Sequence, residues 1–76
     1  MDLSNEIKAI RHNAFMTQET FAKELGVAFS TVNRWEMGKT QPNMSTMKKI
    51  NDFCNKNDIS FEGLREVWIN KSQLKE

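Results

Sequence analysis

The sequence predicts an all-α protein, a compact bundle of five short helices, on three observations. Apolar residues recur at intervals of three and four positions along five segments, which is the spacing of one helix face. The chain has only 3 glycines, 1 proline and no tyrosine, too few turn residues for a sandwich or barrel of many short strands. Its 76 residues suit a single domain, which we expect to span residues 1–76.

The first two helices are predicted from their caps and their apolar residues. Ser4 is expected to cap a first helix that runs to about Asn13 and turns Ile7 and Ile10 inward. Thr17 is expected to cap a second helix, which Gly26 ends by adopting the left-handed conformation. The residues of this second helix expected to face the core are Phe21, Ala22 and Leu25.

Three further helices complete the prediction. The third is expected from Ala28 to Met37, with Val32 and Trp35 inward and Gly38 after its end, although alanine is a poor cap. Asn43 is expected to cap a fourth helix whose apolar stripe is Met44, Met47, Ile50, Phe53 and Cys54. Ser60 is expected to open a fifth helix whose apolar side is Phe61, Leu64, Val67 and Trp68.

The composition argues against catalysis and metal binding. Cys54 is the single cysteine and His12 the single histidine, so an internal disulfide, a thiolate zinc site and a Cys/His nucleophilic site all lack the residues they need. No glutamate pair lies beside a suitable base. We therefore expect no enzyme, no cofactor and no metal. The amino terminus lacks the features of a signal peptide and no apolar run approaches a membrane span, so we expect no membrane partner and a cytoplasmic location.

The positive charge is concentrated in the middle of the chain. The net charge is +1 overall, but residues 27–49 contain four basic residues and one acidic residue, a net of +3. The segments on either side are each at −1. A polyanion would bind this middle segment, although three charges are a weak signal by themselves.

The segment from Thr17 to Pro42 has the spacing of a DNA-reading pair of helices. Two helices joined by a short turn around Gly26 must cross closely, which requires a small residue at the contact, and Ala22 lies four positions before that glycine. Val32 supplies the apolar anchor of the second helix. Ser30, Asn33 and Arg34 then point outward together, and Arg and Asn pair bidentately with guanine and adenine. A solvated polar face is the alternative interpretation.

Residues 7–59 resemble the lambda repressor-like, or Cro-type (XRE), helix-turn-helix family. The resemblance is carried by Ile7–Arg11, Met16–Val27 and Ser30–Pro42, with Gly38, Lys39 and Pro42 the most specific positions. It does not include residues 65–76, which would form a C-terminal extension. Ala28 stands where the family usually has Ser or Thr, and Phe29 stands where polar residues are common. Phe29 either contacts a thymine methyl group or folds back onto Val32 as part of the core.

The resemblance implies a role for each matching position. Base readout falls to Phe29, Ser30, Asn33 and Arg34. Phosphate contacts fall to Thr17 and Gln18 at the start of the second helix, and to Lys39, Thr40 and Asn43 after the third. Arg11 and Glu36 match a structural ion pair of the family.

These roles predict a transcription regulator, most simply a repressor, that binds double-stranded DNA as a homodimer on a palindromic operator. Val67 and Trp68 extend the apolar side of the fifth helix and either form the dimer interface or close the core. The alternative function is a protein-interaction module such as an antitoxin or adaptor. The two functions differ in salt response, because phosphate contacts release counterions and an apolar protein interface does not.

Overall fold

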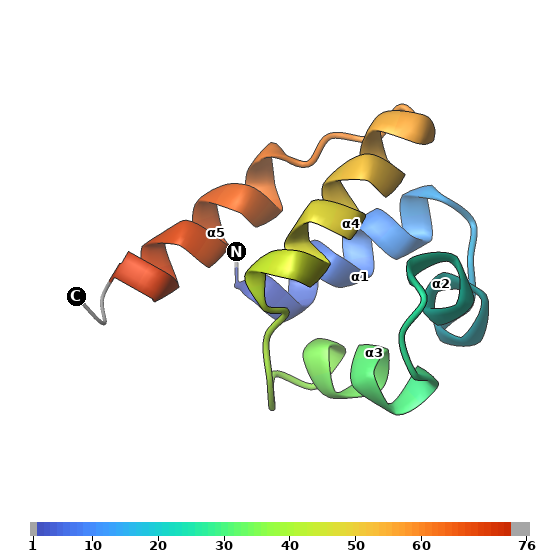
Figure 1. Cartoon of the computed structure of the whole chain (residues 1–76), viewed down its shortest axis with the longest axis horizontal. Coiled ribbons are helices and arrows are strands. Elements are labelled where there is room, and N and C mark those ends of the chain that lie inside the picture. The colour runs from blue at the N-terminus through green and yellow to red at the C-terminus, as the bar shows by residue number, and fades with distance from the viewer. Residues whose placement is uncertain (1, 74–76) are drawn as a thin grey trace.

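The computed structural model describes residues 2–73 and contains five helices. They are α1 (Leu3–Asn13), α2 (Gln18–Leu25), α3 (Phe29–Glu36), α4 (Met44–Lys56) and α5 (Glu62–Gln73), shown in Figure 1. No strand occurs within residues 2–73, so the expected all-α, five-helix architecture is confirmed. None of the helices in this part of the chain has the length and apolar character that crossing a membrane requires.

The caps explain where the helices begin. The cap of α1 is Asp2 rather than the expected Ser4: the Asp2 carboxylate accepts from the Asn5 backbone N–H at 2.9 Å and from the Ser4 hydroxyl at 3.0 Å. Because the Asp2 carboxylate binds the backbone N–H three positions along the chain, the helix begins at Leu3, two residues earlier than a Ser4 cap would allow. Asn43 caps α4 as expected, accepting from the Thr46 N–H at 2.9 Å.

Helix α3 begins without a side-chain cap, and helix α5 begins later than the sequence suggested. Ala28 lies at the cap position of α3 in extended backbone, and no side-chain bond closes that end. Helix α5 begins at Glu62, one residue later than a Ser60 cap would give. The Ile59 N–H donates to the Cys54 carbonyl at 2.8 Å, which completes the end of α4. Residues 59–61 remain outside both helices.

One apolar core joins all five helices. Its fully buried members are Phe21, Ile7, Ile50, Leu64, Val32 and Cys54. The rings of Phe21 and Phe53 meet edge to face at 5.2 Å, which ties α2 to α4. Met44 was expected inward but is 62% exposed. As the first residue of α4 it extends past the edge of the core, and Met47 makes the inward contact one turn later.

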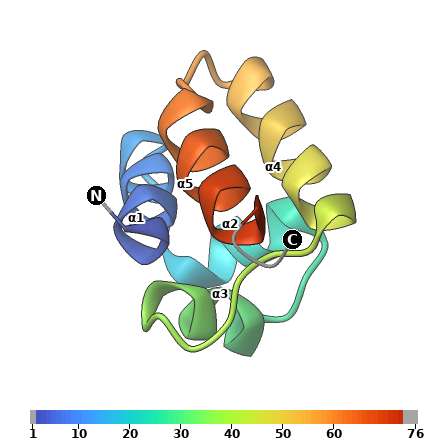
Figure 2. The ribbon, with the colours of Figure 1, turned by 90° about the vertical axis from the view of Figure 1, so that its left-hand side faces the viewer.

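The helix packing leaves α3 at one end of the molecule. Helix α3 packs against α1 and α2, while α5 packs against α1. In Figure 2 the segment that joins α3 to α4 passes below the C-terminal half of α5. The connecting segment therefore lies beside α3 at this end of the molecule.

Candidate nucleic-acid interface

The turn between α2 and α3 is tight because of Ala22 and Gly26. Gly26 has φ +71°, a left-handed conformation that glycine adopts without steric cost. The turn closes through the Val27 N–H, which donates to the Ala22 carbonyl at 3.0 Å. Ala22 is 2% exposed and allows α3 to approach α2 closely. The crossing directs the outer side of α3 away from the core.

The outer side of α3 contains the four residues that the resemblance proposed for base readout. Ser30 and Arg34 are exposed, Asn33 is half-buried, and Phe29 is 52% exposed. Of the two alternatives for Phe29, folding back into the core beside the fully buried Val32 is therefore wrong. An aromatic ring on an outward helix face is available for apolar contact with a thymine methyl group.

Arg11 and Glu36 lie in direct contact, linking α1 to the end of α3. The Arg11 Nε donates to Glu36 Oε2 at 2.7 Å and its Nη2 donates to Oε1 at 2.9 Å, a bidentate arrangement. The third guanidinium nitrogen, Nη1, donates to the Met16 carbonyl at 2.9 Å. The side chains are 12% and 2% exposed respectively, so the pair is largely shielded from water.

The ion pair continues into the residues proposed to contact DNA. Gln18 Nε2 donates to Glu36 Oε1 at 3.0 Å, and Asn33 Nδ2 donates to Gln18 Oε1 at 3.1 Å. Four side chains from α1, α2 and α3 thus form one hydrogen-bonded row. Sequence reasoning placed Gln18 on phosphate and Asn33 on a base but missed their mutual contact, which a separation of 15 residues conceals.

The row shifts the pKa of both charged members. Burial raises the pKa of the Glu36 carboxyl, but the hydrogen bonds from Arg11 and Gln18 together with the charges of Arg11 and Lys8 outweigh it, so the net pKa lies below the ordinary value. The hydrogen bond to Glu36 raises the pKa of Arg11 against the opposing effect of burial. Both side chains are therefore charged at neutral pH.

The row leaves Asn33 able to read a base. Its amide has two N–H donors, of which Gln18 uses one, and its Oδ1 is an acceptor. Adenine recognition needs one donor to N7 and one acceptor for N6, and both are left over. The contact with Gln18 restricts how the Asn33 carboxamide rotates. Gln18 likewise keeps one amide N–H beyond its bond to Glu36.

The residues proposed for phosphate contact lie at two places beside α3. Thr17 is exposed and caps α2, where its Oγ1 accepts from the Thr20 N–H at 3.1 Å. Lys39 and Thr40 are exposed in the segment after α3. The Lys39 N–H donates to the Arg34 carbonyl at 2.9 Å, and Gly38 has φ +77°. Asn43 is exposed but its Oδ1 is committed to capping α4, which leaves its amide donors for an anion.

Trp68 has a role that sequence reasoning left open. It is half-buried and packs against the core, and its Nε1 donates to the Pro42 carbonyl at 2.7 Å. Of the two alternatives for this residue, the structure therefore shows it closing the core of its own chain. The contact joins α5 to the segment between α3 and α4.

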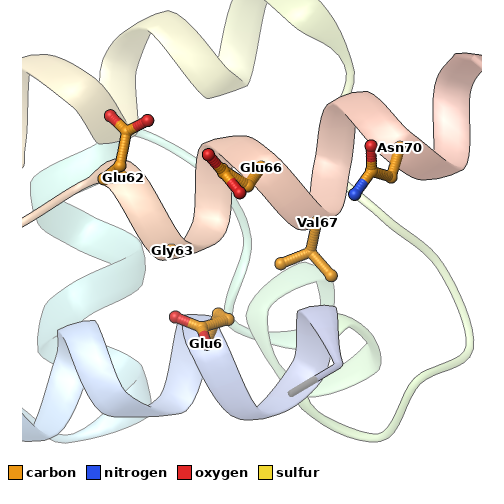
Figure 3. Close-up of a pocket in the computed structure, with 6 residues that line it drawn as sticks. All are labelled: Glu6, Glu62, Gly63, Glu66, Val67 and Asn70. Carbon is orange, nitrogen blue, oxygen red and sulfur yellow. The ribbon is translucent and has the colours of Figure 1, made fainter.

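A shallow groove between α1 and α5 lies outside the polar surface of α3. It is lined by Glu6, Glu62, Gly63, Glu66, Val67 and Asn70, shown in Figure 3. Three of the six are carboxylates, which would repel a phosphate backbone. Within residues 2–73, no group of three or more His, Cys, Asp or Glu side chains has an arrangement that would hold a metal ion.

Comparison with known proteins agrees with this geometry. Residues 7–59 match the family described as helix-turn-helix. A curated protein of Enterococcus faecalis, the HTH-type transcriptional activator BcrR, is 34% identical over 53 residues, which cover 70% of this chain and 26% of that protein. The match thus covers far less than two thirds of the relative's length. No solved structure gives a significant match.

Proposed function

Because this chain belongs to the helix-turn-helix family, with a lambda repressor-like arrangement of five helices, we propose that it regulates transcription by sequence-specific binding to double-stranded DNA. In this proposal α3 lies in the major groove. The observation that carries it is the outward polar face of α3, on which Arg34 is exposed and Asn33 is held by Gln18. Asn33 donates to Gln18, and Gln18 donates to Glu36 of the buried ion pair with Arg11. A polar face that served only solvation would not need its asparagine held in this way.

Arg34 and Lys39 are proposed to have different roles although both are positive. Arg34 projects from α3 and presents a planar guanidinium that matches O6 and N7 of guanine. Lys39 follows the left-handed Gly38, beyond the end of α3, where the phosphate backbone would pass. Thr17, Gln18, Thr40 and the amide groups of Asn43 are proposed to contact phosphates on either side, and Phe29 and Ser30 to contribute to readout.

Two copies are proposed to bind a palindromic operator with half-sites about 34 Å apart. A chain with a net charge of +1 and few phosphate contacts binds one half-site weakly, so useful affinity requires a second copy. The indole N–H of Trp68 is engaged within its own chain, so that group is not available to a dimer interface. Sedimentation of the complex on a complete palindrome tests this assembly, and a single copy bound to it would contradict the proposal.

We propose that the protein acts in the cytoplasm as a repressor. This action is the simplest, because a protein bound to an operator that overlaps a promoter blocks transcription without any contact with the polymerase. The relative from Enterococcus faecalis is described as an activator, so a reporter assay must be able to register an increase as well as a decrease. The reporter should carry the operator at a promoter and, as a control, the same promoter with the operator scrambled.

The decisive experiment selects bound sequences from random DNA and then compares two variants on the selected operator and a scrambled duplex at several salt concentrations. Arg34→Ala should cost about 1–3 kcal/mol on the operator and relax the preference at one base position. Lys39→Ala should weaken binding to both duplexes by the same factor. It should also reduce the slope of log affinity against log salt concentration by about the contribution of one phosphate contact. If Arg34→Ala weakens both duplexes by one factor, Arg34 contacts only the backbone. A protein-interaction module, such as an antitoxin or adaptor, would select no sequence and show no steep salt dependence.

A further inference from the structure

The segment between α3 and α4 contains three of the proposed phosphate-binding residues, Lys39, Thr40 and Asn43, and it is tied to α5 at one point. Trp68 Nε1 donates to the Pro42 carbonyl at 2.7 Å. We propose that Trp68 is a positioning residue for DNA binding, which holds this segment in the conformation that meets the phosphate backbone. The inference rests on the proposed function and adds to it a residue outside the part of the chain matched to the family, residues 7–59.

The hydrogen bonds along the segment show why the contact matters. At one end, the Gly38 and Lys39 N–H groups donate to the Trp35 and Arg34 carbonyls at 3.1 and 2.9 Å. At the other end, Asn43 caps α4. Across residues 2–73, the bond from Trp68 is the one hydrogen bond that reaches residues 40–42. The middle of the segment therefore depends on α5 for its polar anchoring.

The two partners suit each other chemically. Pro42 is buried and has no N–H, so its carbonyl is its one backbone hydrogen-bonding group and needs a partner. The indole of Trp68 is donor only, and its ring packs against the core. Packing therefore fixes where the donor lies, and the donor fixes Pro42. Lys39 and Thr40, three and two positions earlier respectively, remain exposed toward solvent.

An ordered segment binds phosphate more tightly than a mobile one, because less conformational entropy is lost on binding. The contacts in the complex stay the same in number, so loss of the tether should lower affinity without lowering the salt slope. This behaviour differs from that of Lys39→Ala, which removes a charge and lowers the slope. A tryptophan that only stabilised the fold would affect neither quantity while the protein stayed folded.

Trp68→Phe tests the inference, because it keeps an aromatic ring and removes the N–H. In the free protein, ¹⁵N relaxation should show lower order parameters for the amides of Thr40 and Gln41, while that of Thr31 in α3 stays unchanged. The affinity for the operator and for a scrambled duplex should fall by the same factor, about three- to tenfold, which is the range a single hydrogen bond supports. The matched control is Ile10→Val, which loosens the core at α1 without touching the segment.

A double-mutant cycle separates positioning from general stabilisation. In a background where Lys39→Ala and Thr40→Ala remove two of the phosphate contacts of this segment, Trp68→Phe should have a smaller effect on affinity. If the Phe variant fails to fold, a synthetic chain with benzothienylalanine at position 68 keeps the bicyclic shape and replaces N–H by sulfur. Unchanged order parameters, full additivity in the cycle, or an equal loss of affinity in Ile10→Val would each overturn the tether. A wild-type chain that binds no duplex would instead overturn the proposed function.

Discussion

Replacing Glu36 with alanine tests the shielded ion pair that joins α1 to α3. The substitution removes two hydrogen bonds from Arg11 and one from Gln18, and it leaves the guanidinium with the Met16 carbonyl alone. Removing one partner of a fully buried pair costs about 3–5 kcal/mol, since a charge is left without compensation. Arg11 is 12% exposed and can recover some hydration, so we expect the low end, about 3 kcal/mol.

The chain offers a matched control in its other ion pair. Arg65 and Glu62 lie 3.6 Å apart with side chains 54% and 66% exposed. Glu62→Ala should therefore change stability by less than about 1 kcal/mol, as is usual for an exposed pair. The two alanine variants remove the same charge and differ in the burial of the site.

Thermal and urea unfolding followed by circular dichroism measure both variants. In a domain of this size, about 3 kcal/mol corresponds to a fall in melting temperature of roughly 12–24 °C. Arg11→Met combined with Glu36→Leu should restore most of the loss, because an apolar pair leaves no buried charge. If Glu36→Ala shifted stability no more than Glu62→Ala, the pair would be no more than a surface contact and the reasoning from burial would be wrong.

Three further predictions concern pH, capping and the thiol. The pKa of Glu36 in the folded protein is lower than its ordinary value of 4.5, so its contribution to stability is present above 4.5 and is lost as the pH falls through the folded-state pKa. The stability of Glu36→Gln should therefore lack this acid-dependent loss. Identical profiles of stability against pH for the two proteins would contradict the prediction. Ala28 has the extended backbone of a cap (φ −73°, ψ 149°) without a capping bond, so Ala28→Ser should raise the free energy of unfolding by about 1 kcal/mol, checked by urea titration. Cys54 is fully buried, and burial raises the pKa of its thiol to about 11. Iodoacetamide at pH 8 should therefore react with it only after the protein unfolds, at a rate that rises with urea concentration. Rapid labelling of the native protein would count against the buried position.

The helix pattern was predictable because it depends on periodicity, which is local. Ala22, Gly26 and Val32 lie within one continuous segment, and their spacing favoured two closely crossing helices. Errors arose where neighbouring residues compete for one task. Asp2 and Ser4 are both good caps, and the carboxylate took the position. Met44 continued an apolar stripe but lies at the first position of its helix, where the core no longer covers it.

Contacts between residues far apart in the sequence could not be predicted from local sequence patterns. The bond from Asn33 to Gln18 spans 15 positions and the bond from Trp68 to Pro42 spans 26. The first depends on the angle at which α2 and α3 cross, and the second on where the segment between α3 and α4 passes α5; periodicity encodes neither. Phe15 shows the same limit within a loop: it adopts φ +57° and is 96% exposed, although phenylalanine gives no sequence signal for a left-handed conformation.

The pairing of Arg11 with Glu36 also changes the electric field that an approaching duplex meets. Glu36 touches Gln18, whose end of α2 is proposed to approach a phosphate, so a bare carboxylate there would repel the backbone at a range comparable to the Debye length of about 8 Å. With both of its oxygens bonded to Arg11, the carboxylate and guanidinium act together as a dipole, whose field decays faster with distance than that of a single charge. At the position of the duplex, the positive charges of Arg34 and Lys39 are therefore little reduced by the negative charge of Glu36, which lies between them in the sequence.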